Sequence, residues 1–278
     1  MAEYLVRYAG KGNHSIPLHI GEYIMAAVKD SIKILENIAL TDDVFSMWLD
    51  ASTIAKKAIP GQFVNLFSKD HSMMLPRPIS ICEIDKLGGR IRLVFRVVGK
   101  GTKEFSLLKR GDSIEVMGPL GNGFSIEGKK ALIIGGGIGI PPLLQLSKDF
   151  AGEKHIVLGY RDTTFMEEDF RAYGNVYIST EDGSRGVKGN VVNAIEENNL
   201  DADIIYACGP TPMLKGLQQY AKEHNIKAQL SLEERMACGV GACLGCVCKS
   251  RSVDDHSMVN NKRVCKEGPV FYGDEVEL

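Results

Sequence analysis

The sequence predicts a multi-domain β plus α/β protein: an antiparallel β-barrel, then a doubly wound parallel-sheet domain, then a small C-terminal cysteine module. Three observations support this order. Short turn-bounded strand patterns fill the first half of the chain, and apolar strands alternate with helical stretches from about residue 130. Five of the seven cysteines lie between positions 238 and 265. We place the domains at 28–126, 127–229 and 230–278, after an N-terminal extension of unknown role at 1–27.

Composition limits the classes of protein to consider. The 278 residues are 44% hydrophobic, which is enough for two domains, and the net charge of −2 lacks the basic excess of a general nucleic-acid binder. The N-terminus has no apolar signal region, and the longest apolar stretch, 131–146, is too short and glycine-rich to span a membrane. We therefore expect a cytoplasmic protein that binds neither nucleic acid nor membrane. In that reducing compartment, clustered cysteines usually bind metal or carry out redox chemistry.

The barrel prediction depends on six short runs rich in β-branched and apolar residues, each bounded by glycine, proline or charged turns. They span 31–38, 44–50, 62–67, 77–84, 90–98 and 112–118. One short helix is expected at 102–109.

The second domain is predicted from a change in the hydrophobic pattern after about residue 130. Continuous apolar runs indicate buried strands at 131–134, 156–160, 176–180 and 203–208. Helical stretches intervene at 141–150, 165–172, 189–198 and 211–224. Alternation of this kind is typical of a parallel sheet with helices on both faces.

Two strand ends in this domain carry a pattern for nucleotide binding. The first parallel strand is followed by GGGIGIPP (135–142), where a tight glycine turn and a helix N-terminus suit a phosphate. The pattern is incomplete, because Pro142 stands at the third glycine position of the dinucleotide fingerprint, so a turn without ligand stays open. The second cue is YACGP (206–210), where Cys208 is either a small core residue or a neighbour of the ligand's reacting end.

Two motifs in the barrel suit an anion. RPIS (77–80) offers the guanidinium fork of Arg77 and the hydroxyl of Ser80, although Arg-Pro at a strand start is also ordinary. GKGT (99–102) presents backbone N–H groups at a helix start, with Thr102 nearby.

The cysteine spacing carries the strongest signal. Four positions follow C-x4-C-x2-C…C, the plant-type [2Fe–2S] spacing: Cys238, Cys243, Cys246 and Cys265. Small residues between them let a loop wrap a cluster and leave N–H groups for its sulfurs. A zinc site is the alternative, but zinc ribbons usually show two C-x2-C pairs. Cys248 and His256 are possible competing ligands.

These motifs, in this order and ending in CKEGPVF (265–271), resemble the electron-transfer subunits of bacterial NAD-dependent (class 1B) dihydroorotate dehydrogenases, within the ferredoxin reductase superfamily. The resemblance covers about 28–278 and implies a flavin-binding barrel, an NAD-binding α/β domain and a [2Fe–2S] module. It implies FAD contacts at Arg77, Pro78, Ile79, Ser80, Val94, Phe95, Arg96, Gly101 and Thr102. It implies NAD contacts at Gly135, Gly136, Gly137, Ile138, Gly139, Cys208, Gly209 and Pro210. The cluster ligands it implies are the four spaced cysteines.

The resemblance also implies a role in de novo pyrimidine (UMP) biosynthesis. Electrons would come from the FMN of a catalytic subunit that oxidises dihydroorotate, and pass through the cluster and FAD to NAD+. A flavin suits the middle position because it exchanges one electron with a cluster and a hydride with nicotinamide. A heterotetramer with two copies of each subunit is expected. Ser80 and Cys208 are candidate neighbours of the flavin–nicotinamide contact, and no catalytic acid or base is assigned.

Two rival interpretations remain at this point. One is the small subunit of another ferredoxin/NAD(P)H oxidoreductase, and the other is a non-enzymatic, zinc-stabilised interaction module. The residues also leave NAD and NADP open, because Arg161 and Asp162 follow the second parallel strand side by side. Arginine there favours a 2′-phosphate and aspartate a free ribose hydroxyl.

Overall fold

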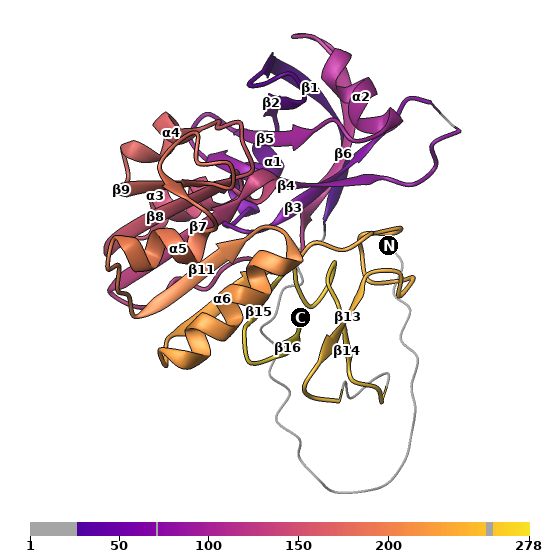
Figure 1. Cartoon of the computed structure of the whole chain (residues 1–278). Helices are drawn as coiled ribbons and strands as arrows, with labels where there is room; N and C mark the ends of the chain where they lie inside the picture. Colours follow the sequence, from indigo (N-terminus) through magenta and orange to yellow (C-terminus); the bar gives the residue numbers. More distant parts are fainter. Residues whose placement is uncertain (1–26, 71, 254–257) are drawn as a thin grey trace, which may run out of the picture.

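The computed structural model describes residues 27–70, 72–253 and 258–278. It shows a barrel, an α/β layer beside it and a small C-terminal module below them (Figure 1). Nearly all of the expected extension 1–27 lies outside the described residues, as does His256.

The barrel is closed by six antiparallel strands in the order β1-β2-β5-β4-β3-β6. All six predicted strands are confirmed: β1 (Val28–Ala39), β2 (Val44–Asp50), β3 (Phe63–Phe67), β4 (Arg77–Asp85), β5 (Arg90–Arg96) and β6 (Ser113–Leu120). Side chains that alternate along these strands, such as Leu49, Leu93 and Val116, are fully buried inside. Closure of the barrel removes the exposed edges that an open sheet would have.

Two helices accompany the barrel. The helix α1 (Ser52–Lys57) was not predicted, whereas α2 (Lys100–Leu107) begins two residues before the expected position. The reason is local, because the Thr102 hydroxyl accepts hydrogen bonds from the N–H groups of Val98 (2.9 Å) and Gly99 (3.2 Å). These bonds close the turn ahead of Thr102, so the helix starts at Lys100.

The second domain is a seven-stranded sheet in the order β10-β9-β8-β7-β11-β12-β15. Its parallel strands are β7 (Lys130–Gly136), β8 (Glu153–Tyr160), β9 (Asn175–Thr180), β10 (Val187–Lys188), β11 (Ile204–Cys208) and β12 (Lys227–Ser231). The helices are α3 (Leu143–Asp149), α4 (Glu167–Arg171), α5 (Val191–Glu197) and α6 (Thr211–Glu223). The predicted strands and helices of this domain are thus confirmed, while β10 and β12 were missed.

The missed strand β12 crosses the boundary that the sequence suggested between residues 229 and 230. Its pattern is mixed, because buried Gln229 sits among apolar neighbours. The Gln229 side chain accepts from Ser125 N (2.9 Å) and donates to Ser125 O (2.7 Å). It therefore satisfies both backbone groups of Ser125, in the linker between the two domains. A polar residue with both groups satisfied can occupy a core strand.

The same linker is held by Tyr206, which is fully buried on β11. Its hydroxyl accepts from Glu127 N (2.7 Å) and lies 3.1 Å from Ser125 O. We expect Tyr206→Phe to lower the free energy of unfolding by about 1 kcal/mol, since the part-buried Glu127 N–H loses its acceptor. Chemical denaturation would measure this, with Tyr220→Phe as the control, because the Tyr220 hydroxyl has no hydrogen bond among the described residues. Equal effects of the two changes would contradict the expectation.

The C-terminal module contains a three-stranded sheet in the order β14-β13-β16: β13 (Val247–Ser250), β14 (Asn261–Arg263) and β16 (Val276–Glu277). It also returns β15 (Val270–Tyr272) to the large sheet, antiparallel to β12. Cys246 and Cys265 share one buried cluster with Phe63 and Leu120 of the barrel. The module is therefore packed onto strands β3 and β6. Within the described residues, no helix is long and apolar enough to cross a bilayer.

Candidate functional site

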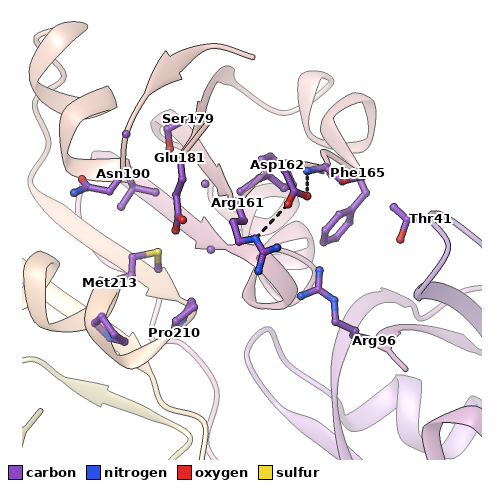
Figure 2. Close-up of a pocket in the computed structure, with 18 of the residues that line it drawn as sticks. Thr41, Arg96, Arg161, Asp162, Phe165, Ser179, Glu181, Asn190, Pro210 and Met213 are labelled. Carbon is purple, nitrogen blue, oxygen red and sulfur yellow. Dashed lines mark hydrogen bonds and ion pairs between the residues drawn. The ribbon is translucent and has the colours of Figure 1, made fainter. Parts of the chain in front are cut away.

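A cleft of about 790 Å³ opens where the parallel strands end and the barrel begins. Its walls come from the ends of β7, β8 and β9, the start of α6, and two barrel segments, 41–43 and Arg96 (Figure 2). The sheet order changes direction between β7 and β11, since β8 lies on one side of β7 and β11 on the other. The carboxyl ends of strands at such a switch point are where ligands bind in open α/β sheets.

The two predicted nucleotide motifs meet at this switch point. Cys208 pairs in register with Gly135 across β11 and β7, so the glycine turn η1 (Gly137–Gly139) and the CGP turn are neighbours. Of the eight predicted residues, Gly136, Gly137 and Pro210 line the cleft directly. The other five, Gly135, Ile138, Gly139, Cys208 and Gly209, lie in the same two turns but do not line the cleft.

The Cys208 side chain lies in the core rather than in the cleft, at 1% exposure. Burial, followed by the nearby Glu233 carboxylate, raises the pKa of its thiol. Desolvation also raises the pKa of the Glu233 carboxyl, although part of this residue is exposed to solvent. Glu233, which follows β12, was not anticipated from the sequence, because its position beside Cys208 depends on the pairing of β11 with β12.

One end of the cleft carries the charged groups that bear on nucleotide choice. Arg161 Nε donates to Asp162 Oδ2 (3.2 Å), and Thr163 N donates to Asp162 Oδ1 (2.6 Å). Hydrogen bonds from Thr163, followed by the one from Arg161, lower the pKa of Asp162. Glu181 points into the same space from the end of β9 (Figure 2), and its carboxylate has no partner among the described residues. The buried Ser179 hydroxyl in the cleft wall likewise has none.

Two of the predicted flavin residues, Arg77 and Gly101, meet at the start of α2. The Arg77 guanidinium lies against Gly101 so closely that a Cβ at Gly101 would overlap its Nε atom. Arg77 Nη1 also donates to Leu75 O, which turns the guanidinium along the end of β4. This arrangement places a cation beside the free N–H groups of a helix N-terminus, a suitable environment for a phosphate.

The remaining predicted flavin residues divide into two groups. Pro78, Ile79 and Ser80 are half-buried on β4, beside Arg77. The side chains of Val94 and Phe95 are buried in the core, at 3% and 1% exposure, which leaves only their backbones available to a ligand. Arg96 reaches the cleft instead, where its Nε lies 3.0 Å from Asp43 Oδ2.

The four spaced cysteines lie in one loop region and form two pairs. The Cys243 thiol hydrogen-bonds to Cys238, and the Cys265 thiol to Cys246. Cys248 lies outside these pairs, on β13, where burial raises the pKa of its thiol to about 11. Among the described residues, no three His, Cys, Asp or Glu side chains converge on a single point as they would around one metal ion.

Backbone N–H groups of the loop already point at the sulfurs. Cys238 Sγ accepts from Val240 N (3.4 Å) and Ala242 N (3.3 Å), and Cys265 Sγ accepts from Gly241 N (3.1 Å). Burial disfavours the Cys238 thiolate, but these donors outweigh it and lower the pKa to about 6. Cys265 Sγ accepts from the single N–H group of Gly241, and burial raises the pKa of its thiol to about 12. Thiolates at these positions are the donors that a cluster requires.

Asn65 connects the cysteine loop to the barrel and had no sequence signal. It lies on β3, fully buried, and its Nδ2 donates to Cys238 O (3.2 Å) across 173 residues of sequence. Its Oδ1 is buried without a donor among the described residues. On β3 it pairs with Pro78 of β4, the second residue of RPIS.

Comparison with known proteins identifies the C-terminal module. Residues 233–277 match a family model described as the iron-sulfur cluster binding domain of dihydroorotate dehydrogenase B. Among solved structures, an NADH-dependent reduced ferredoxin-NADP oxidoreductase is 32% identical with a TM-score of 0.79, covering 88% of this chain and 89% of that one. A ferredoxin reductase of carbazole 1,9a-dioxygenase, at 19% identity and a TM-score of 0.62, shares the fold over 73% of this chain and 68% of its own.

Curated relatives match over nearly their whole length. The "Dihydroorotate dehydrogenase B (NAD(+)), electron transfer subunit" of Caldanaerobacter subterraneus subsp. tengcongensis is 44% identical over 89% of this chain and 98% of its own. The protein of the same description from Fusobacterium nucleatum is 43% identical over 87% of this chain and 96% of its own. The chain therefore belongs to the family of electron transfer subunits of NAD(+)-dependent dihydroorotate dehydrogenase B.

Proposed function

We propose that this chain carries electrons from the FMN of a dihydroorotate-oxidising catalytic subunit, through a [2Fe–2S] cluster and FAD, to NAD+. The observation that carries the proposal is the arrangement of three sites in one fold: paired cysteines, an arginine at a helix N-terminus, and a cleft at the switch point of the sheet. When bound, the flavin supplies the exchange between single electrons and hydride. The residues of the chain hold and orient these groups.

The cluster would be held by Cys238, Cys243, Cys246 and Cys265. Two sulfur pairs fit a two-iron group, in which each iron takes two protein thiolates, better than a single zinc ion surrounded by four. The N–H groups of Val240, Gly241 and Ala242 would continue to donate to sulfur, which tunes the reduction potential.

The FAD phosphates would lie between Arg77 and the first turn of α2, at Gly101 and Thr102. The flavin ring would follow Pro78, Ile79 and Ser80 along β4, with the backbone of Val94, Phe95 and Arg96 beside it. Buried Asn65 Oδ1 supports this fit, because an unpartnered buried carbonyl costs about 1–3 kcal/mol and a flavin ring edge carries an N–H donor.

NAD would occupy the cleft, with its phosphates at Gly136, Gly137 and Pro210. At the far end, Asp162 engages Arg161, so that this arginine is less available to a 2′-phosphate. Arg185 is engaged as well, since its Nη2 lies 2.5 Å from Glu167 Oε2. The carboxylate of Glu181 is then suited to accept hydrogen bonds from ribose hydroxyls, and this charge pattern favours NAD over NADP.

We expect Glu181→Gln to lower the preference for NADH over NADPH by about tenfold, because it removes a charge that repels the 2′-phosphate. The measurement is the ratio of kcat/KM values for the two nucleotides with ferricyanide as acceptor. Glu197→Gln, on α5, is a matched control and should leave the ratio unchanged. An unchanged ratio for Glu181→Gln would assign the choice of nucleotide to other residues.

The catalytic partner would dock on the cysteine loop, because an electron must enter close to the cluster. Cys243 is the exposed member of the ligand set, and the apolar side chains of Val240 and Leu244 beside it are 46% and 56% exposed. Exposed apolar side chains around a redox group mark an interaction surface. The assembly would contain two copies of each subunit.

We expect Leu244→Glu to weaken binding of the catalytic subunit by about tenfold or more, as for a central interface residue. Calorimetry of the two purified subunits would measure the Kd. NADH–ferricyanide activity should stay unchanged, because that reaction does not use the partner. Leu87→Glu is the control, because Leu87, in the β4–β5 turn, is fully exposed. Equal affinities of wild type and Leu244→Glu would place the partner elsewhere.

The proposal as a whole is tested by an absorbance spectrum of the purified protein with iron and flavin analysis. It predicts two irons and one FAD per chain. A colourless protein with zinc and no flavin would establish the interaction-module alternative. The other rival, a ferredoxin/NAD(P)H oxidoreductase, is less favoured, because the named dihydroorotate relatives are more similar than the 32%-identical ferredoxin-NADP enzyme.

A further inference from the structure

The route between the cysteine loop and the flavin strand crosses a single strand of the barrel. The strand order β4-β3-β6 places β3 beside β4, which carries RPIS, and the buried cluster containing Cys246 and Cys265 includes Phe63 of β3. Adjacent strands lie about 4.8 Å apart, so any residue on β3 opposite RPIS is close to both groups. Asn65, in register with Pro78, is such a residue.

Asn65 makes a specific contact with the cysteine loop. Its Nδ2 donates to the carbonyl of Cys238, the first predicted ligand, at 3.2 Å. The next residue, Gly239, has a φ of +68°, and a Cβ there would overlap the Asn65 side chain. A glycine at this position thus serves two purposes: it permits the left-handed turn, and it lets the loop backbone approach β3.

The other end of the carboxamide is unused within the described residues. Asn65 Oδ1 is buried and has no donor, while the residue as a whole is 0% exposed. A buried polar residue in a barrel strand is costly unless each of its groups has a partner. One group binds the cysteine loop, and the other is available to a donor on the flavin side.

We propose that Asn65 is a positioning residue that fixes the cysteine loop against the flavin strand and thereby sets the rate of electron transfer between cluster and FAD. The inference rests on the proposed function. It concerns the internal step, so a change at Asn65 should slow reduction of the cluster more than it slows reduction of the flavin by NADH.

The test uses full-length protein with both cofactors bound, as established by iron and flavin analysis. On rapid mixing with NADH, the rate of flavin bleaching is measured separately in wild type and Asn65→Leu, because Asn65 Oδ1 is also available to the flavin. Relative to flavin bleaching, the reduced-cluster EPR signal should appear about tenfold or more slowly than in wild type, within the roughly 100-fold that a misplacement of about 1 Å can cost. Asn65→Leu retains the branched shape of the side chain without its hydrogen-bonding groups, and Asn65→Ala provides a second variant. The EPR line shape should also change, because the hydrogen bond to Cys238 O is lost.

Asn122→Ala is the matched control. Asn122 also joins barrel to module, since its Nδ2 donates to Glu267 O (2.9 Å) in the turn after Cys265, but among the described residues none of its hydrogen bonds reaches segment 238–246. The inference predicts wild-type cluster reduction in this control. Wild-type kinetics and line shape in both Asn65 variants would overturn it, as would equal slowing in Asn122→Ala. Loss of iron from both Asn65 variants would also overturn it, by making Asn65 a residue of cluster assembly. If wild-type protein lacks flavin or its flavin is not reduced by NADH, the proposed function itself fails.

Discussion

Replacing Cys243 with serine is expected to remove the [2Fe–2S] absorbance and to stop electron transfer from dihydroorotate to NAD+ in the assembled complex. Cys243 forms a sulfur pair with Cys238, so one iron would lose one of its two thiolates. Loss of an outer partner of a metal ligand already costs about 10- to 100-fold, so loss of a ligand should reduce turnover by more than about 100-fold. NADH–ferricyanide activity through the flavin should remain.

Cys248→Ser is the matched control for this experiment. Cys248 lies only five residues from Cys243, but on β13 and outside the two sulfur pairs. Its raised pKa of about 11 keeps it a protonated thiol at neutral pH. We therefore expect this variant to retain two irons and full turnover. If Cys248→Ser loses the cluster while Cys243→Ser retains it, the ligand assignment is wrong.

Replacing Arg77 with alanine is expected to weaken FAD binding by about 10- to 100-fold, as calculated from the 1.5–3 kcal/mol that a hydrogen bond to a charged group contributes. The guanidinium is held against Gly101 at the start of α2, where phosphate charge would be stabilised from two sides. Fluorescence titration of the flavin-free protein with FAD measures the affinity.

Arg90→Ala serves as the control for Arg77. Arg90 is another barrel arginine, on β5, but it pairs with Asp85 at 2.8 Å and packs over Trp48. Its removal should leave FAD affinity within about twofold, since its ion pair is a surface interaction. Equal FAD affinity of Arg77→Ala and wild type would count against the phosphate site at α2.

Much of the fold could be predicted because its signals are local. Buried and exposed residues alternate along the barrel strands, and the glycine turn directly follows an apolar strand. Both patterns could therefore be recognised within short stretches of sequence. The two nucleotide motifs were correctly expected at strand ends. Their adjacency follows from the right-handed crossovers of a parallel sheet, which bring the ends of β7 and β11 together.

The missed features depend on distant contacts. Strand β12 is stabilised partly by Gln229, whose partner Ser125 is 104 residues away. β15 has three residues and exists only because it pairs with β12. In the sequence, Asn65 cannot be told from any other polar residue of a strand. Its contact with Cys238 forms only when the C-terminal module packs onto the barrel. Cys208 is a further case, because its sequence position left open both a core residue and a neighbour of the ligand, and its side chain lies in the core.

The central claim is that this chain passes electrons from dihydroorotate oxidation to NAD+. The most direct measurement combines the purified chain with the purified FMN-containing catalytic subunit and follows NADH formation on addition of dihydroorotate and NAD+. The account predicts NADH formation only when both subunits are present, and its loss in Cys243→Ser. Absence of NADH formation from a complex that retains all cofactors, together with NADH-dependent reduction of ferredoxin by this chain, would contradict it.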